Sequence, residues 1–188
     1  SVRAVADSQA YLAEGYIAYK LVALSRAVPR REVPGEVVDR VLAAEERLSE
    51  KQREAVRMAV ESPVSVITGG PGTGKTTVMS GILALYDQMK VKTLLAAPTG
   101  RAAKRLAECT GREASTIHRL LESQFDEETG MMSFFHDEDE PLPCDALIVD
   151  ETSMVDLPLM ASLLKALKPG CRLLLVGDPD QLPPVGPG

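Results

Sequence analysis

The sequence lacks several features that would point to whole classes of protein. It contains no tryptophan, and aromatic residues make up only 4% of its 188 residues. Its three cysteines, Cys109, Cys144 and Cys171, are odd in number and scattered, so neither a disulfide framework nor a zinc site is expected. No signal peptide is present, and no apolar run is long enough to cross a membrane. The composition fits a reducing cytoplasm without membrane contact.

Charge and length narrow the possibilities further. The formal net charge is −6, so any contact with nucleic acid has to be a local patch rather than a property of the whole chain. Hydrophobic residues make up 45% of the sequence, which is enough for a substantial core. The chain begins at Ser1 without a methionine, and we expect it to be part of a longer protein. We predict a helical N-terminal appendage and linker over residues 1–47 and a main domain over residues 48–188.

A glycine-rich segment carries the clearest motif. Gly69, Gly74, Lys75 and Thr76 satisfy the pattern G-x-x-x-x-G-K-[ST] between a β-branched apolar run and a helical apolar pattern. Small residues let several backbone N–H groups surround one anion, and the helix N-terminus adds its dipole. Lys75 would then reach the β- and γ-phosphates of ATP, and the Thr76 hydroxyl would ligate Mg²⁺. The predicted nucleotide-binding residues here are Gly70, Pro71, Gly72, Thr73, Gly74, Lys75, Thr76 and Thr77.

The alternative for this segment is a glycine-rich turn before an ordinary helix. The flanking strand and helix make that alternative the weaker one. A second apolar run, residues 145–149, ends in Asp150 and Glu151. Asp150 is positioned to hold Mg²⁺, mostly through water, and Glu151 to polarise the attacking water as a general base. A strand-end acidic turn is the alternative, and it is weak beside an intact phosphate-binding motif.

The remaining apolar runs predict the fold. Residues 92–97 and 172–176 form further buried strands, so four strands alternate with helices in a mainly parallel sheet. This order predicts a three-layer α/β/α domain of the P-loop NTPase class, preceded by helices over residues 1–28 and 36–46. Gln181 follows the last strand and lies where ligands bind in such sheets, so it is expected to contact the γ-phosphate.

Several other segments have local signals. Ser49 and Gln52 form a capping-box pattern at the start of a third helix, which gives Gln52 a purely structural role. Residues 114–121 suggest a short capped helix, and residues 125–135 suggest a hairpin around a glycine turn. The acidic run 137–140 is interpreted as part of a solvated insertion.

A basic cluster lies near the start of the helix predicted over residues 102–109. It contains Arg101, Lys104 and Arg105. A solvated basic face is one interpretation. Cations are unfavourable at a helix N-terminus, however, so an external anion such as a phosphate backbone is the other.

The order of these motifs resembles superfamily 1 DNA helicases of the RecD-like group, which includes the alpha subunit of bacterial exodeoxyribonuclease V. The resemblance covers about two-thirds of the chain. The Pro183-Pro184 pair after Gln181 resembles the RecD-like branch of superfamily 1, whose members move 5′ to 3′. The motifs that carry it are Gln52, residues 69–76, 97–101, 115–118, 149–154 and 176–185.

The resemblance implies roles at matching positions. Gln52 would recognise adenine, and the strand before Gln181 would lie between the strands that precede Lys75 and Asp150. The segment expected along single-stranded DNA contains Pro98, Thr99, Gly100, Arg101 and His118.

Such helicases need a second RecA-like domain with an arginine finger, so this chain is expected to be the first motor domain alone, nearly inactive by itself. The leading hypothesis is an ATP-dependent 5′-to-3′ DNA helicase in the bacterial cytoplasm, with recombination and repair nuclease subunits as candidate partners. A nucleotide-binding module without independent helicase activity, acting inside a multi-subunit nuclease, is the alternative. A third hypothesis is a P-loop ATPase that is not a helicase. Strong stimulation of the ATPase activity by single-stranded DNA would favour the helicase over this hypothesis.

Overall fold

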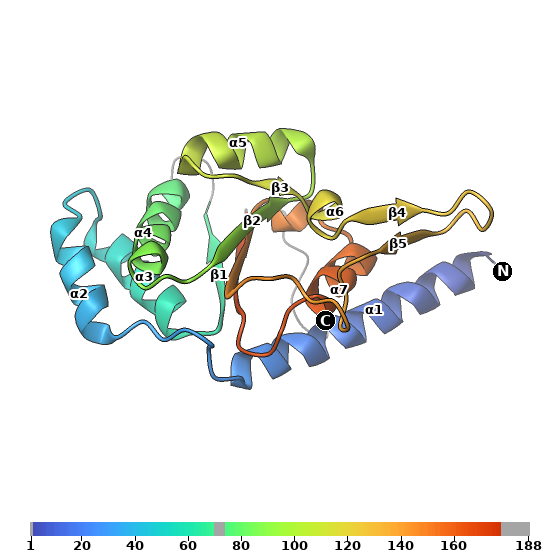
Figure 1. The fold of residues 1–188 in the computed structure, drawn as a ribbon, viewed down its shortest axis with the longest axis horizontal. Coiled ribbons are helices and arrows are strands. Elements are labelled where there is room, and N and C mark those ends of the chain that lie inside the picture. The colour runs from blue at the N-terminus through green and yellow to red at the C-terminus, as the bar shows by residue number, and fades with distance from the viewer. Residues whose placement is uncertain (1, 70–73, 178–188) are drawn as a thin grey trace.

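The centre of the fold is a parallel sheet in the computed structural model, which describes residues 2–69 and 74–177 (Figure 1). All neighbouring strands in this sheet run parallel. In spatial order its five strands are β1 (Val64–Thr68), β7 (Arg172–Gly177), β6 (Ala146–Val149), β2 (Thr93–Ala97) and β3 (Ser115–Thr116).

The fifth strand corrects the sequence prediction of four strands and of a single helix over residues 114–121. Ser115 and Thr116 pair with Ala96 and Ala97 at the end of β2, so they continue the sheet. The Thr116 side chain then accepts the Arg119 N–H at 3.2 Å and caps the short helix α6 (Ile117–Leu120). Two residues of strand followed by one helical turn leave no periodic pattern long enough to separate from a short helix.

Helices cover both faces of the sheet and give the predicted three layers. The first face packs against α2 (Gly35–Ala44), α3 (Glu50–Glu61), α4 (Lys75–Gln88) and, through Leu106, α5 (Gly100–Thr110). The opposite face packs against α1 (Val2–Arg26), α6 and α7 (Leu157–Lys165).

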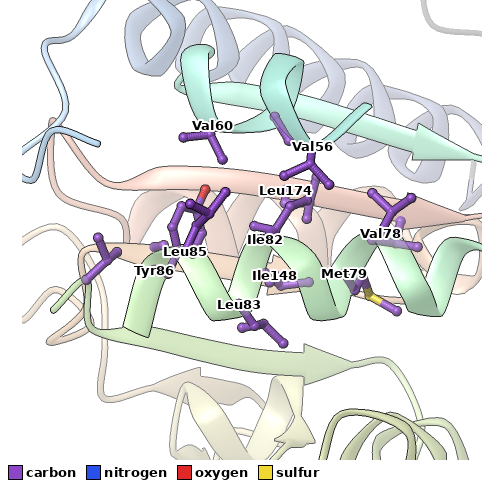
Figure 2. Packing of buried hydrophobic residues seen from close by; sticks show 14 of the residues in the cluster. Val56, Val60, Val78, Met79, Ile82, Leu83, Leu85, Tyr86, Ile148 and Leu174 are labelled. Carbon is purple, nitrogen blue, oxygen red and sulfur yellow. The ribbon is translucent and has the colours of Figure 1, made fainter. Parts of the chain in front are cut away.

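Successive side chains along a strand point to opposite faces of the sheet, so each strand contributes to both halves of the core. Along β6, Ala146 and Ile148 belong to the first cluster, whereas Leu147 and Val149 belong to the second. Figure 2 shows Ile148 and Leu174 from two strands meeting Ile82 of α4. Fully burying one such side chain contributes about 1.5–3 kcal/mol. The four apolar residues of β6 are all buried, as expected for a central parallel strand.

The N-terminal helices pack onto the same core. Helix α1 runs without a break, and its Leu24 is 1% exposed in the cluster with α7. Val38 and Leu42 of α2 are buried in the cluster with α4. The buried Arg172 donates to the carbonyl oxygens of Arg31 and Val60, which ties the linker after α1 to the sheet. The division of the chain at residue 48 stays a prediction.

The predicted hairpin is present and extends away from the sheet (Figure 1). It consists of β4 (Ser123–Phe125) and β5 (Met132–Phe134), which pair antiparallel around a turn where Gly130 has a φ of 69° (Figure 1). Within the part of the chain that the structure describes, no helix combines the length and the apolar character that a membrane span requires.

Candidate nucleotide site and neighbouring strand ends

The predicted functional residues that follow described strands lie at one edge of the sheet. All five strands are parallel, so their carboxyl ends meet at this edge, which is where ligands bind in open α/β sheets. Strand β7 lies between β1 and β6, as the family resemblance implied. Gln181 follows β7 but lies outside the described residues, as do Gly70, Pro71, Gly72 and Thr73 of the phosphate-binding motif.

The start of α4 is the described end of the predicted phosphate-binding motif. Gly74 is the N-cap, with a φ of 81° in the left-handed region, and the helix begins at Lys75. The first N–H groups of a helix have no partner within it, so they face the ligand side together with the positive end of the dipole. Lys75 and Thr77 are half-buried and Thr76 is exposed. The cation and the hydroxyls are therefore accessible at the helix N-terminus.

Gln52 has the structural role that the capping box predicted. Its Oε1 accepts the Ser49 N–H at 2.9 Å, and its own N–H donates to Ser49 Oγ at 3.2 Å. The Gln52 amide nitrogen also lies against Gly74, so closely that a Cβ at Gly74 would collide with it. The start of α3 thus supports the end of the phosphate-binding loop. The adenine contact stays a prediction.

The two carboxylates follow β6 on a tightly fixed backbone. Glu151 has a φ of 52°, which side chains other than glycine rarely adopt, and its N–H donates to Asp150 Oδ1 at 2.8 Å. The Asp150 N–H donates to the Ala96 carbonyl at 3.0 Å. Asp150 and Glu151 are both half-buried. They occupy the end of the strand next to β7, two strands away from the phosphate-binding loop.

Thr152 fixes this turn, and sequence reasoning missed it. Its hydroxyl lies 3.2 Å from the Val149 carbonyl oxygen and 3.0 Å from the Val176 carbonyl oxygen, so it links the ends of β6 and β7. The threonine in the Asp-Glu-Thr sequence was the available signal. Its bridging role depends on β7 being the neighbour of β6, which only the strand order reveals.

Arg105 also approaches this turn. Its Nη1 lies 3.9 Å from Glu151 Oε1, with the two side chains 61% and 33% exposed. Sequence reasoning grouped Arg105 with the residues expected to face DNA. In the structure its guanidinium contacts the carboxylate expected to act as the base.

The segments expected along DNA lie at the two strand ends beyond β6. Pro98 and Thr99 follow β2, and His118 follows the neighbouring β3, where its ring lies 6.0 Å from that of Phe134. Thr99 has a structural role as well, because its hydroxyl accepts the Ala102 N–H at 3.1 Å and caps α5. Gly100 and Arg101 are exposed in the first turn of α5. The structure therefore brings these residues to adjacent strand ends, although it does not test their contact with DNA.

Comparison with known proteins shows the family to which the chain belongs. The family model described as "AAA domain" matches residues 52–187. The chain belongs to the AAA domain family. It is 49% identical over 145 residues to an ATP-dependent RecD2 DNA helicase of Deinococcus radiodurans, covering 77% of this chain and 19% of the relative. It is 40% identical over 201 residues to the RecBCD enzyme subunit RecD of Mycolicibacterium smegmatis, covering 95% of this chain and 35% of the relative.

These relatives confirm the resemblance to RecD-like helicases. The chain spans about a fifth of the length of the RecD2 helicase and about a third of the RecD subunit. Among solved structures, a Bacteroides Pif1 bound to single-stranded DNA is 28% identical over 74% of this chain and 34% of its own, with a TM-score of 0.48. That score is too low to support an argument.

The residues of this AAA domain fit a nucleotide with Mg²⁺. Magnesium is usually bound through one or two protein oxygens together with substrate phosphates and water, so it needs no cage of several acidic residues. Thr76 offers a hydroxyl and Asp150 a carboxylate, of which Oδ1 is engaged by the Glu151 N–H. Within the described ranges, no group of three or more acidic, histidine or cysteine side chains forms a metal cluster. The Thr76 hydroxyl and the Asp150 carboxylate therefore suit a Mg²⁺ ion whose other ligands are nucleotide phosphate and water.

Proposed function

We propose that this chain is the nucleotide-binding first motor domain of an ATP-dependent 5′-to-3′ DNA helicase of the RecD-like family. The observation that carries the proposal is the strand order β1-β7-β6-β2-β3. It puts the start of α4 after β1 and the Asp150–Glu151 turn after β6, on either side of β7, and the segment from Pro98 to Arg101 with His118 at the ends of the next two strands. A nucleotide site and a strand-binding surface that adjoin along one edge suit a motor that couples hydrolysis to movement on DNA.

Each residue at the nucleotide site has a role set by its chemistry. Lys75 neutralises charge on the β- and γ-phosphates, and Thr76 and Asp150 hold Mg²⁺. Glu151 accepts the proton of the attacking water, and Gln181 contacts the γ-phosphate. When bound, Mg²⁺ neutralises charge that develops on the transferring phosphoryl group.

The DNA contacts and the polarity belong to the same proposal. Arg101 would contact backbone phosphate, and Pro98, Thr99, Gly100 and His118 would lie along the single strand. Arg101 is exposed in the first turn of α5, where a fixed cation is better accommodated beside an external anion than alone. The 5′-to-3′ polarity rests on Pro183 and Pro184, which lie outside the described residues.

Relatives named RecBCD enzyme subunit RecD are parts of a larger enzyme, which supports nuclease subunits as partners of the full-length protein. A bacterial cytoplasm is part of the same proposal. The relatives do not favour the alternative, a nucleotide-binding module without helicase activity of its own, because a relative named RecD2 is itself called an ATP-dependent helicase.

Glu151→Gln in the full-length protein tests the catalytic assignment. The amide cannot accept the proton, so we expect ATP binding to persist and steady-state hydrolysis with single-stranded DNA to slow by about 10²–10⁴. Titration of ATP by calorimetry checks binding on the same sample. A turnover rate equal to that of the wild type would assign the base to another residue.

A further inference from the structure

An ion pair between Arg105 and Glu151 connects the two halves of the functional edge. Arg105 lies on α5, the helix whose first turn contains Arg101, and its Nη1 is 3.9 Å from Glu151 Oε1. Arg101 and Arg105 are four residues apart, so they share one face of the helix. Both are exposed. The face expected to contact DNA phosphate therefore also contacts the carboxylate expected to activate water.

The backbone of Glu151 is fixed, which leaves its carboxylate as the part free to change partner. Its N–H is bound by Asp150 Oδ1, and its carbonyl oxygen accepts the Met154 N–H at 3.0 Å. Thr152 holds the same turn to β6 and β7. A left-handed φ persists at such a residue only where the surroundings determine it. Side-chain rotation therefore decides whether the carboxylate faces Arg105 or the nucleotide.

We propose that Arg105 is a positioning residue that restrains Glu151 while DNA is absent, a role that rests on the proposed function of Glu151 as the base. At 3.9 Å the guanidinium attracts the carboxylate by charge, which favours the side-chain orientation that faces Arg105 over one that faces a water molecule at the nucleotide. The pair is partly exposed, so it is weak enough to open.

Single-stranded DNA supplies the competing partner. A backbone phosphate on the face shared by Arg101 and Arg105 attracts the Arg105 guanidinium, which binds phosphate in the same forked geometry as carboxylate. Glu151 is then released for its work on water. The arrangement makes hydrolysis dependent on DNA through one arginine, without requiring any rearrangement of the sheet.

The test is Arg105→Ala in the full-length protein, with ATP hydrolysis measured without DNA and at saturating single-stranded DNA. The DNA-free kcat should rise by about two- to five-fold, the factor that loss of an exposed ion pair gives, and the ratio of stimulated to basal kcat should fall. The KM for ATP should stay unchanged, because the nucleotide contacts remain. Arg105→Lys should restore the low basal rate in part.

Lys104→Ala is the matched control. Lys104 carries the same charge on the same helix and makes no ion pair among the residues that the structure describes, so its removal should leave the basal kcat unchanged. A folded Arg105→Ala protein with an unchanged or lower basal kcat would overturn the proposal. So would an equal rise in Lys104→Ala, because general charge on α5 would then explain the effect.

Glu151→Gln in the same assay separates the two proposals. If it abolishes hydrolysis while Arg105→Ala behaves like the wild type, the base assignment stands and the restraint by Arg105 is wrong. If Glu151→Gln hydrolyses ATP normally, the base assignment is wrong and the restraint has no function to act on.

Discussion

At the scale of single residues, Gly74 links the nucleotide loop to the helix beside it. Its φ of 81° disfavours any Cβ, and a Cβ there would also displace the end of the Gln52 side chain. Alanine in a left-handed conformation costs about 1–2 kcal/mol, before any displacement of Gln52. The backbone conformation is therefore the main reason that this position demands glycine.

Gly74→Ala should lower the thermal midpoint of the chain by about 2–8 °C, given that about 1 kcal/mol shifts a domain of this size by about 2–4 °C. It should also weaken ATP binding, because the start of α4 and Gln52 must move apart. Thermal unfolding followed by circular dichroism and an ATP titration measure the two effects. Gly15→Ala is the control, since Gly15 lies in α1 with open space around it and should be neutral or stabilising. Equal midpoints for both variants would contradict this account of Gly74.

Residue contacts could be predicted from the sequence when both partners lie close together along the chain, and not when they lie far apart. The capping box of Ser49 and Gln52 was predictable because both partners lie within one helical turn of sequence. The contacts of Arg105 with Glu151 and of Thr152 with β7 were not, because they depend on which strands are neighbours. Lys75 and Asp150 were found through motif spacing, and their roles stay predictions.

At the scale of elements, α4 and the segment after α5 are joined by an ion pair. Arg112 Nη1 donates to Asp87 Oδ1 at 2.8 Å, and a second contact joins Arg112 Nη2 to Asp87 Oδ2. Hydrogen bonding from Arg112 lowers the pKa of Asp87 below its usual range. A carboxyl group with a lowered folded-state pKa stabilises the fold above its unfolded pKa of about 3.9 and loses that contribution as the pH falls.

Asp87→Asn should therefore destabilise the chain at pH 7 and leave it less sensitive to acid. Urea unfolding at pH values from 7 down to 3 measures this directly. The difference in unfolding free energy between wild type and variant should shrink as the pH falls below about 4, where Asp87 in the unfolded chain is already protonated. A difference that stays constant over the whole range would mean that Asp87 titrates alike in both states.

Elements marked by a local pattern of apolar and turn residues were predictable, and strand β3 was not. The strands before Lys75 and Asp150 and the hairpin around Gly130 followed from apolar runs and turn residues. Strand β3 was missed because two residues extend a sheet only when an edge such as the end of β2 is available to them. That availability is a property of the assembled sheet.

At the scale of the whole molecule, one sheet edge combines the described residues that are predicted to serve nucleotide binding and DNA binding. The fold class, the order of β7 between β1 and β6, and the family all agree with the motifs in the sequence. The chain spans about a fifth to a third of the relatives described. An arginine finger from a facing domain is worth about 10³–10⁵ in rate, so we expect the complete activity only where such a domain is present.

The most direct test of this account is unwinding of a duplex with a single-stranded tail by the full-length protein, compared with its Lys75→Ala variant and with the 188-residue chain alone. The account predicts ATP-dependent unwinding from a 5′ tail by the wild type. It predicts none from the folded Lys75→Ala variant, which lacks the cation at the phosphates, and none from the chain alone. Unwinding by Lys75→Ala at the wild-type rate, or equal unwinding from a 3′ tail, would contradict it.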